Sequence, residues 1–481
     1  MTLIRIAACG LALLLVAACT TPEPPRVQAG TVAGTACTPP TGPVEAETAT
    51  TIDVVEQAYL CILGRYHGGA TLDARSLLTT GFAALTRELD RSGREVPEAV
   101  MPALTGDRGT DWAAFETAYR KIADRVPDLR DRLAAVTLRA LVAALGDGHA
   151  RWTRQDGRPP GHYDGDGYGL GLQTNVTGPR ADTGPGSAVA PLFVTGVLGG
   201  AARAAGLRPG DVIESINDSA PFADDRAGPA IAALHPEYPE ARPVRLRLLR
   251  QATGRRWSVT LRPGLFPQDP ADLRVVRSEL LDGDDGDDGD GGGIAYVRMT
   301  GFTPDSANRA LRAIARLRTG RTLSGLVLDL RGNGGGSPLE ATRLLSAFVH
   351  GRNTAYRCTA DGTCRATPTD DTVELLGLPS VVLVDRGCAS ACEHFSSAVK
   401  DLRIAPLVGT RTAGVISGPV GTYLLGDNTF LHLPTGYHLG PNREVIDRIG
   451  VPPDHHVPLT PKDAAAGRDP ALAKALTLLR T

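Results

Sequence analysis

Residues 381–394 read Val-Val-Leu-Val-Asp-Arg-Gly-Cys-Ala-Ser-Ala-Cys-Glu-His, and this is the most informative stretch of the 481-residue sequence. The apolar residues 381–384 predict a buried strand, which a glycine turn connects to a helix that begins at Ser390. A serine in this place is exposed on a tight turn, and the N–H groups of the first helical turn can hold developing negative charge beside it. Ser390 is therefore either a nucleophile or only a helix N-cap, and this stretch alone favours neither.

A second strand–loop–helix pattern lies upstream. Residues 326–336 read Leu-Val-Leu-Asp-Leu-Arg-Gly-Asn-Gly-Gly-Gly, an apolar strand that runs into a glycine-rich loop. A nucleotide-binding loop is disfavoured because no Gly-Lys-Ser/Thr ending follows, and Ser337 stands where a dinucleotide fingerprint has its third glycine. Alternating strands and helices predict a layered βαβ core. We expect a hairpin that turns at residues 426–428 to close its sheet.

Together, the two stretches resemble the tail-specific, or C-terminal processing, serine peptidase family, which also includes the core of the tricorn protease. The family's nucleophile region reads Ser-Ala-Ser-Ala-Ser-Glu, and its middle serine, catalytic in the family, matches Ser390. Cys388 and Cys392 replace the outer serines. The resemblance implies an α/β, crotonase-like fold and an oxyanion hole built from N–H groups. The donors would be Ala391 and either Gly334 or Gly335. It implies no metal and no cofactor.

The choice of general base depends on one position at which this sequence differs from the tail-specific branch of the family. The tail-specific branch places a lysine in a Gly-Lys-Gly run about two dozen residues after the nucleophile, but Val415 occupies that place here, and valine cannot accept a proton. His149 is the candidate because similar runs carry the base in the tricorn-like branch, although a lone histidine on such a loop is more often a surface residue. Asp447 matches that branch's acidic residue or is a solvated loop charge, and Glu444 is the alternative for orienting the imidazole.

Residues 160–265 resemble a PDZ domain. The stretch Gly169, Leu170, Gly171 and Leu172 is similar to its carboxylate-binding loop, and residues 206–217 carry the most specific match. The resemblance implies that an extended peptide adds as a strand, with backbone N–H groups holding its C-terminal carboxylate. The alternative is that these glycines only form turns in a small β domain.

The N-terminus predicts a targeting segment. Residues 1–19 contain a short apolar run that ends in Val-Ala-Ala-Cys, similar to a bacterial lipobox in which Cys19 is lipidated. The run is too short to span a bilayer, and an ordinary cleaved signal is the alternative. Thr20 after the cysteine is typical of sorting to the outer membrane, so we expect an anchor on its periplasmic face. The Asp/Gly-rich run at 282–293 lacks calcium-ligand spacing and is expected to be a solvated loop.

Six of the eight cysteines remain after Cys9 is removed with the signal peptide and Cys19 is lipidated. This even number fits an oxidising compartment, in which cysteines pair as disulfides. Cys358 and Cys364 flank a hairpin-like turn and are expected to pair, and Cys37 and Cys61 are candidates for a second bridge. For the two cysteines beside Ser390, a bridge and simple burial both remain open.

The length predicts several domains, and the formal charge of −2 gives no reason to expect nucleic acid binding. We expect a signal peptide at 1–19, a tether at 20–45, a helical domain at 46–155, the PDZ-like domain at 160–265, a peptidase core at 268–460 and a helical tail at 461–481. The predicted function is a lipid-anchored periplasmic serine endopeptidase that acts on proteins or peptides. The alternative is a peptide- or lipid-binding protein that has lost catalysis on this scaffold.

Overall fold

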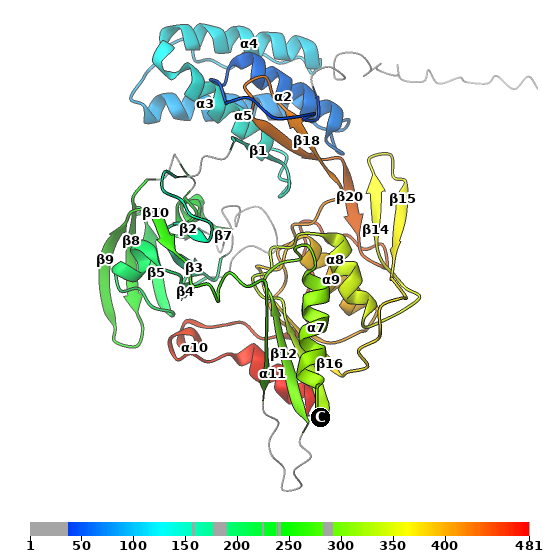
Figure 1. Ribbon diagram of the computed structural model, residues 1–481. Helices are drawn as coiled ribbons and strands as arrows, with labels where there is room; N and C mark the ends of the chain where they lie inside the picture. The colour runs from blue at the N-terminus through cyan, green and yellow to red at the C-terminus, as the bar shows by residue number, and fades with distance from the viewer. Residues whose placement is uncertain are drawn as a thin grey trace, which may run out of the picture.

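The computed structural model describes residues 37–155, 159–176, 190–223, 226–236, 238, 242–281 and 292–480. The signal and lipobox expected at 1–19, with Cys19, lie outside this part of the chain, as do tether residues 20–36 and acidic-run residues 282–291. Figure 1 shows a layer of helices above a small β region and an α/β core. No helix within the described ranges is both long enough and apolar enough to cross a membrane.

The N-terminal layer consists of helices whose apolar residues recur at helical spacing and meet in one core, with Phe115, Leu133 and Leu138 fully buried. Asp73 and Asp107 cap two of these helices by accepting backbone N–H groups of the first turn. The helices are α2 (Ile52–Arg65), α3 (Ala74–Arg91), α4 (Arg108–Arg125) and α5 (Arg130–Ala143).

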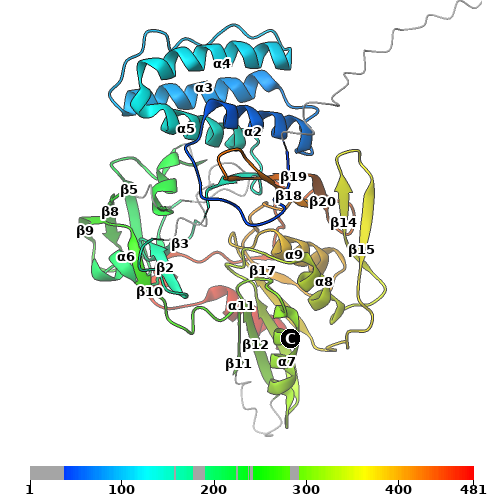
Figure 2. The same cartoon turned by 45° about the horizontal axis from the view of Figure 1, so that its top comes forward.

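A three-stranded antiparallel sheet lies under this helical layer, as Figure 2 shows. It contains β1 (Arg151–Thr153), β18 (Val420–Leu424) and β19 (Phe430–Pro434). The hairpin expected at 426–428 therefore forms, but the prediction that it closes the core sheet is wrong. Leu431 and Leu433 are buried against the helical layer, and that apolar surface decides where the hairpin packs.

The small β region, residues 160–267, has a core in which the strands alternate buried and exposed side chains, as β8 does. Its main sheet has the order β5 (Asp211–Ile216), β8 (Val244–Arg250) and β9 (Arg255–Leu261). Two strand pairs add β2 (Asp166–Gly169) with β10 (Gly264–Pro267), and β3 (Leu172–Thr174) with β4 (Val194–Val197). The remaining short elements are β6 (Phe222–Ala223), β7 (Arg226–Ala227), α6 (Gly200–Ala204) and the 3-10 turn Pro229–Leu234.

The α/β core contains a six-stranded sheet, and its central strands are buried on both faces, as expected for parallel strands covered on both sides. In sheet order the strands are β11 (Val276–Leu281), β12 (Gly293–Met299), β13 (Leu323–Asp329), β16 (Ser380–Val384), β17 (Leu407–Gly409) and β21 (His455–His456). Only β11 is antiparallel to its neighbour, and β21, rather than the hairpin, completes the sheet.

Helices cover both faces of this sheet. One face carries α7 (Ser306–Arg318), α8 (Pro338–Ser346) and α9 (Ala391–Asp401), and the other carries α11 (Pro470–Leu479). The short helix α10 (Pro461–Ala465) precedes α11, and a side sheet contains β14 (Asn353–Thr359), β15 (Cys364–Pro368) and β20 (Gly436–Leu439). Because β13 and β16 are parallel neighbours, the loops that follow them lie together at one edge of the sheet.

Candidate active site

Ser390 lies on the turn that follows β16, and residues 387–391 are called the Ser390 turn below. Its φ is +56°, a left-handed value that is costly for a non-glycine residue. The surroundings hold this conformation: Ser390 N–H donates to Val415 O at 2.8 Å, and Ala389 N–H donates to Asn333 O at 3.0 Å. Ser390 is also the N-cap residue of α9, so both interpretations offered by the sequence describe the same residue.

His149 meets Ser390 across 241 residues of sequence, with Nε2 at 3.2 Å from Ser390 Oγ. It lies on the loop after α5, residues 144–150, called the His149 loop below. Arg448 holds this loop to the core because its Nη2 donates to Leu145 O at 3.0 Å. Val415 packs directly against Gly148, where an added Cβ would overlap its Cγ1. The valine that stands in the family's lysine position therefore fills the space beside the histidine.

Asp147 is a buried carboxyl group in the His149 loop that sequence reasoning did not single out. Its Oδ1 accepts the backbone N–H of His149 at 2.9 Å, and its Oδ2 accepts the Tyr66 hydroxyl at 3.3 Å and lies 3.7 Å from His67 Nε2. Burial alone would raise the pKa of Asp147, but the bonds from His67 and His149 hold that pKa below its usual value. An Asp two residues before an ordered loop residue is the pattern of an Asx turn, and that signal was available.

Asp447 lies near Asp147, and its Oδ1 accepts the Ile416 N–H at 3.3 Å. Burial, and then the negative charge of Asp147, raise the pKa of Asp447 to about 6. The alternative residue, Glu444, accepts the Asn442 N–H and lies beside Asp401. Burial and a hydrogen bond with Asp401 raise the pKa of Glu444 to about 7. The structure therefore gives Asp447, rather than Glu444, an electrostatic link to the His149 loop.

Glu393 ties the Ser390 turn to the segment at 412–415. Its fully buried carboxylate accepts Thr412 Oγ1–H at 2.6 Å, the backbone N–H groups of Gly414 and Val415 at 2.6 and 2.8 Å, and that of Ser390 at 3.3 Å. Burial raises the pKa of Glu393 to about 7, against the effect of these four bonds. The sequence contained a signal for this role, because a Glu three residues after a helix N-cap is the pattern of a capping box.

The glycine loop, residues 332–336, packs against the Ser390 turn. Gly335 has a φ of +94°, and a Cβ there would lie 2.7 Å from Ser390 Cβ and 2.9 Å from Ala391 N, so the approach requires glycine. Gly335 N–H donates to Asn333 Oδ1 at 2.9 Å. Gly334 and Ala391 N–H groups donate to no acceptor within the described ranges, so they are the pair available for an oxyanion.

Residues 293–457 match the model for peptidase family S41. This segment of the chain, which contains Ser390 and the glycine loop, is similar to that family of serine peptidases. The chain is 28% identical over 359 residues to carboxyl-terminal-processing peptidase 2, chloroplastic, of Arabidopsis thaliana, covering 72% of this chain and 65% of the relative. It is also 28% identical over 396 residues to tricorn protease homolog 1 of Streptomyces coelicolor, covering 77% of this chain and 33% of the relative. The chain therefore spans less than two thirds of the length of these two relatives.

A solved structure of mature CPAF complexed with lactacystin resembles this chain in fold. The two are 12% identical, the TM-score is 0.51, and the match covers 84% of this chain and 98% of that one. The mixed α/β fold expected from the sequence is confirmed.

Three disulfides occur among the described residues. They are Cys37–Cys61, Cys358–Cys364 and Cys388–Cys392. The last disulfide connects the residues on the two sides of Ser390. Both of its cysteines are also fully buried, so the bridge and the burial that the sequence left as alternatives occur together.

The four residues 169–172 lie in the small β region, apart from the Ser390 turn (Figure 1). Gly171 has a φ of +75°, and its carbonyl accepts the N–H groups of Leu198 and Gly199 at 2.9 and 3.3 Å. Leu170 is buried in the core of this region, so its side chain anchors residues 169–172 to that core.

Proposed function

We propose that the chain is a serine endopeptidase in which Ser390 Oγ attacks the carbonyl carbon of a peptide bond and His149 Nε2 accepts its proton. The 3.2 Å contact between these two atoms carries the proposal, because it is the geometry that activates a hydroxyl nucleophile. His149 then donates the proton to the leaving amine. In the second half of the reaction it accepts a proton from water, which hydrolyses the acyl-enzyme.

The tetrahedral intermediate carries its negative charge on the former carbonyl oxygen. We propose that Gly334 and Ala391 N–H groups bind that oxygen, supported by their unused donor capacity beside Ser390. An ionised Asp447, with Asp147, would stabilise the imidazolium that forms when His149 accepts its proton. The buried Asp147 and the partly buried Asp447 lie close enough to interact electrostatically beside the His149 loop, which supports this role.

A Ser–His mechanism of the tricorn type is supported by Val415 at the lysine position and by the packing of this valine against Gly148. Lys400, the lysine that follows Ser390 on α9, forms an ion pair with Asp454. The base in this proposal is therefore His149, and Lys400 stabilises structure.

A fluorophosphonate probe tests the proposal, because it reacts with an activated serine and not with an unactivated hydroxyl. We expect the wild-type protein to be labelled and to hydrolyse peptides, and Ser390→Ala to do neither. The competing function is a binding protein that has lost catalysis. A folded wild-type protein that binds peptides but is neither labelled nor active would establish that function and exclude ours.

We propose that the small β region is a PDZ-like module that recognises substrate tails. Support comes from the resemblance of residues 169–172 and from the left-handed glycines that shape this loop. A peptide with a free C-terminus should bind more tightly than its amidated twin by roughly 1.5–3 kcal/mol, the worth of a charge-assisted hydrogen bond. Equal affinities in a calorimetric titration would exclude tail recognition.

We propose that Cys19 is lipidated and anchors the protein to the periplasmic face of the outer membrane. Support comes from the lipobox-like Val-Ala-Ala-Cys at residues 16–19. Cys19→Ser should leave a protein that no longer sediments with membranes, and unchanged sedimentation would mean that another segment binds the membrane.

A further inference from the structure

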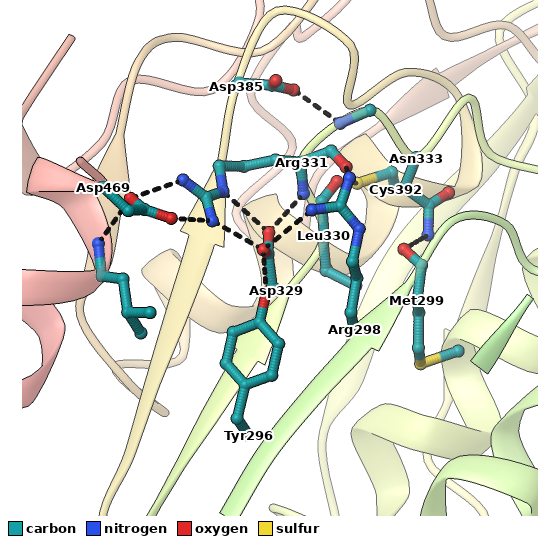
Figure 3. A network of polar contacts seen from close by, with 12 residues as sticks. Tyr296, Arg298, Met299, Asp329, Leu330, Arg331, Asn333, Asp385, Cys392 and Asp469 are labelled. Carbon is teal, nitrogen blue, oxygen red and sulfur yellow. Dashed lines mark hydrogen bonds and ion pairs between the residues drawn. The ribbon is translucent and has the colours of Figure 1, made fainter. Parts of the chain in front are cut away.

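Arg331 links the core sheet to the C-terminal helix through two carboxylates (Figure 3). Its Nε and Nη2 lie 2.9 and 2.7 Å from the two oxygens of Asp329, and its Nη1 and Nη2 lie 2.9 and 2.7 Å from those of Asp469. Both pairs have the bidentate geometry that fixes a guanidinium in one orientation. Arg331 therefore has a defined position between two elements separated by 138 residues of sequence.

The inner partner of this bridge is fixed at the end of β13. Asp329 is fully buried and also accepts the Tyr296 hydroxyl at 2.6 Å and Arg298 Nη1 at 3.3 Å. Burial alone would raise the pKa of Asp329, but Arg331, with Arg298 and Tyr296, holds that pKa below its usual value, so the carboxylate stays ionised. Such a carboxylate cannot move without leaving several charged or polar groups unpaired.

The outer partner belongs to the C-terminal segment. Asp469 is the N-cap residue of α11 and accepts the Leu472 N–H at 3.0 Å. Ala471 and Ala475 of this helix pack on the core sheet, and α10 abuts Gly210 of the small β region. Figure 1 shows this red segment running from the small β region to the sheet. The position of Asp469 therefore depends on how the C-terminal segment is seated.

The glycine loop begins at the residue after Arg331. Gly332 N–H donates to Asp385 Oδ1 at 2.8 Å, and the same oxygen accepts Gly387 N–H of the Ser390 turn at 2.9 Å. At the other end of the loop, Phe302 N–H donates to Gly335 O at 2.8 Å. Glycines impose little backbone preference of their own, so the bonds at its two ends, together with those of Asn333 within it, set the conformation of this loop.

We propose that Asp469 is a positioning residue for the oxyanion hole, acting through Arg331 to hold the glycine loop so that the Gly334 N–H faces the developing oxyanion. The inference rests on the proposed peptidase function. Because this donor interacts with negative charge that develops only in the transition state, losing its alignment lowers kcat and leaves KM nearly unchanged.

The test is Asp469→Asn, because asparagine also caps a helix and the substitution removes only the charge that faces Arg331. We expect kcat for peptide hydrolysis to fall about tenfold while KM stays constant. This decrease is smaller than the roughly 10²–10³-fold decrease in kcat that follows complete loss of an oxyanion donor. A peptide boronate that mimics the tetrahedral intermediate should bind about tenfold more weakly. Asp469→Glu, which keeps the charge, should recover part of the loss.

Asp73→Asn is the matched control. Asp73 is also the N-cap residue of a helix, α3, and also pairs with an arginine, Arg75 at 3.1 Å, but in the helical layer rather than in the α/β core. Its kcat and KM should equal those of the wild type. Kinetics are referred to active enzyme, counted by titration with the fluorophosphonate probe.

Three outcomes would overturn parts of the account separately. Unchanged kcat in Asp469→Asn, with an active wild type, overturns the positioning role alone. A loss that disappears after correction for active-site titre shows that Asp469 only stabilises the fold, and this also overturns it. A wild-type protein that neither hydrolyses peptides nor reacts with the probe overturns the proposed function and with it the inference.

Discussion

Ser390 and His149 meet at 3.2 Å, but different kinds of contact hold the two residues in place. The Ser390 turn is fixed from several sides within the α/β core, by backbone bonds to Asn333 and Val415, by the buried Glu393 and by its own disulfide. The His149 loop is instead carried by the helical layer. It reaches the core through Arg448, 303 residues away from Leu145, and through packing of Gly148 on Val415.

This difference indicates where the catalytic pair is most easily separated. To displace Ser390, a change in the Ser390 turn must break several bonds that support one another. In the His149 loop, one added side-chain atom that overlaps a neighbouring residue can move the base without disturbing the core. Proton transfer requires hydrogen-bond distance, and a shift of about 1 Å can cost roughly 10²-fold in rate. The contact between the two regions is therefore the sensitive point of the proposed site.

The largest effect should come from removing the base itself. His149→Ala should lower kcat/KM for peptide hydrolysis by roughly 10²–10⁴-fold, the usual contribution of general base catalysis. Lys400→Ala should keep most of the activity, because Lys400 pairs with Asp454 rather than with Ser390. Steady-state kinetics on both variants, with folding checked by circular dichroism, test the assignment. A folded His149→Ala protein with full activity would exclude His149 as the base.

The next largest effect should come from moving the base without removing it. A Cβ at position 148 would overlap Val415 Cγ1, so Gly148→Ala should displace His149 and lower kcat by about 10²-fold. Val415→Ala removes the overlapping methyl groups, and the double variant should recover most of the lost rate. Val415→Ala alone serves as the control and should change kcat little. Failure of the double variant to recover would show that this contact does not position His149.

A smaller and pH-dependent effect should come from Asp447→Asn. In the folded protein the pKa of Asp447 is raised to about 6 from the 3.8 usual for an aspartate, so the carboxyl is mostly neutral well below pH 6 and mostly charged well above it. Only the charged form can stabilise the imidazolium. The variant should therefore be about tenfold slower than the wild type near pH 8 and nearly equal to it near pH 5.

The same group gives a prediction for stability. Because its folded pKa is raised, the folded state binds the Asp447 proton more tightly, and stability falls as pH rises from about 4 to about 6. Asp447→Asn should consequently unfold at a higher temperature than the wild type near pH 8. In the kinetic comparison, a rate difference between the wild type and Asp447→Asn that does not change with pH would contradict the electrostatic role and indicate that Asp447 acts only through packing.

The sequence predicted the features that short-range patterns determine. The two apolar strands followed by glycine turns form as expected. The structure adds that they are parallel neighbours, which brings Ser390 and the glycine loop to one edge of the sheet. The hairpin at 420–434 also formed as expected, but its partner was misassigned. An alternating strand pair does not reveal whether its apolar face packs on a sheet or on the helices that bury Leu431.

The supporting residues were harder to find because their partners are far apart in the sequence. The link from Arg331 to Asp469 spans 138 residues, and His149 was singled out only by resemblance to a family. The role of Asp147 became visible when the fold placed His67 beside it. Of the two glycines expected as oxyanion donors, Gly335 donates its N–H to Asn333, and this tertiary detail favours Gly334 in our proposal. Local patterns predict such turns but not the tertiary bonds that aim them.

The smallest effect on activity should come from the disulfide beside Ser390. In Cys388→Ser with Cys392→Ser, the hydroxyl at position 388 would have a partner, since Cys388 Sγ lies 3.4 Å from Ser396 Oγ. The other bonds of the Ser390 turn remain, so kcat should change less than about threefold. Stability should fall by about 2 kcal/mol, because an uncrosslinked five-residue loop gains entropy when the chain unfolds. Urea unfolding and active-site titration of the double variant measure the two quantities separately. A large loss of kcat at full titre would mean that the disulfide, rather than Glu393 and Asn333, holds the serine toward His149.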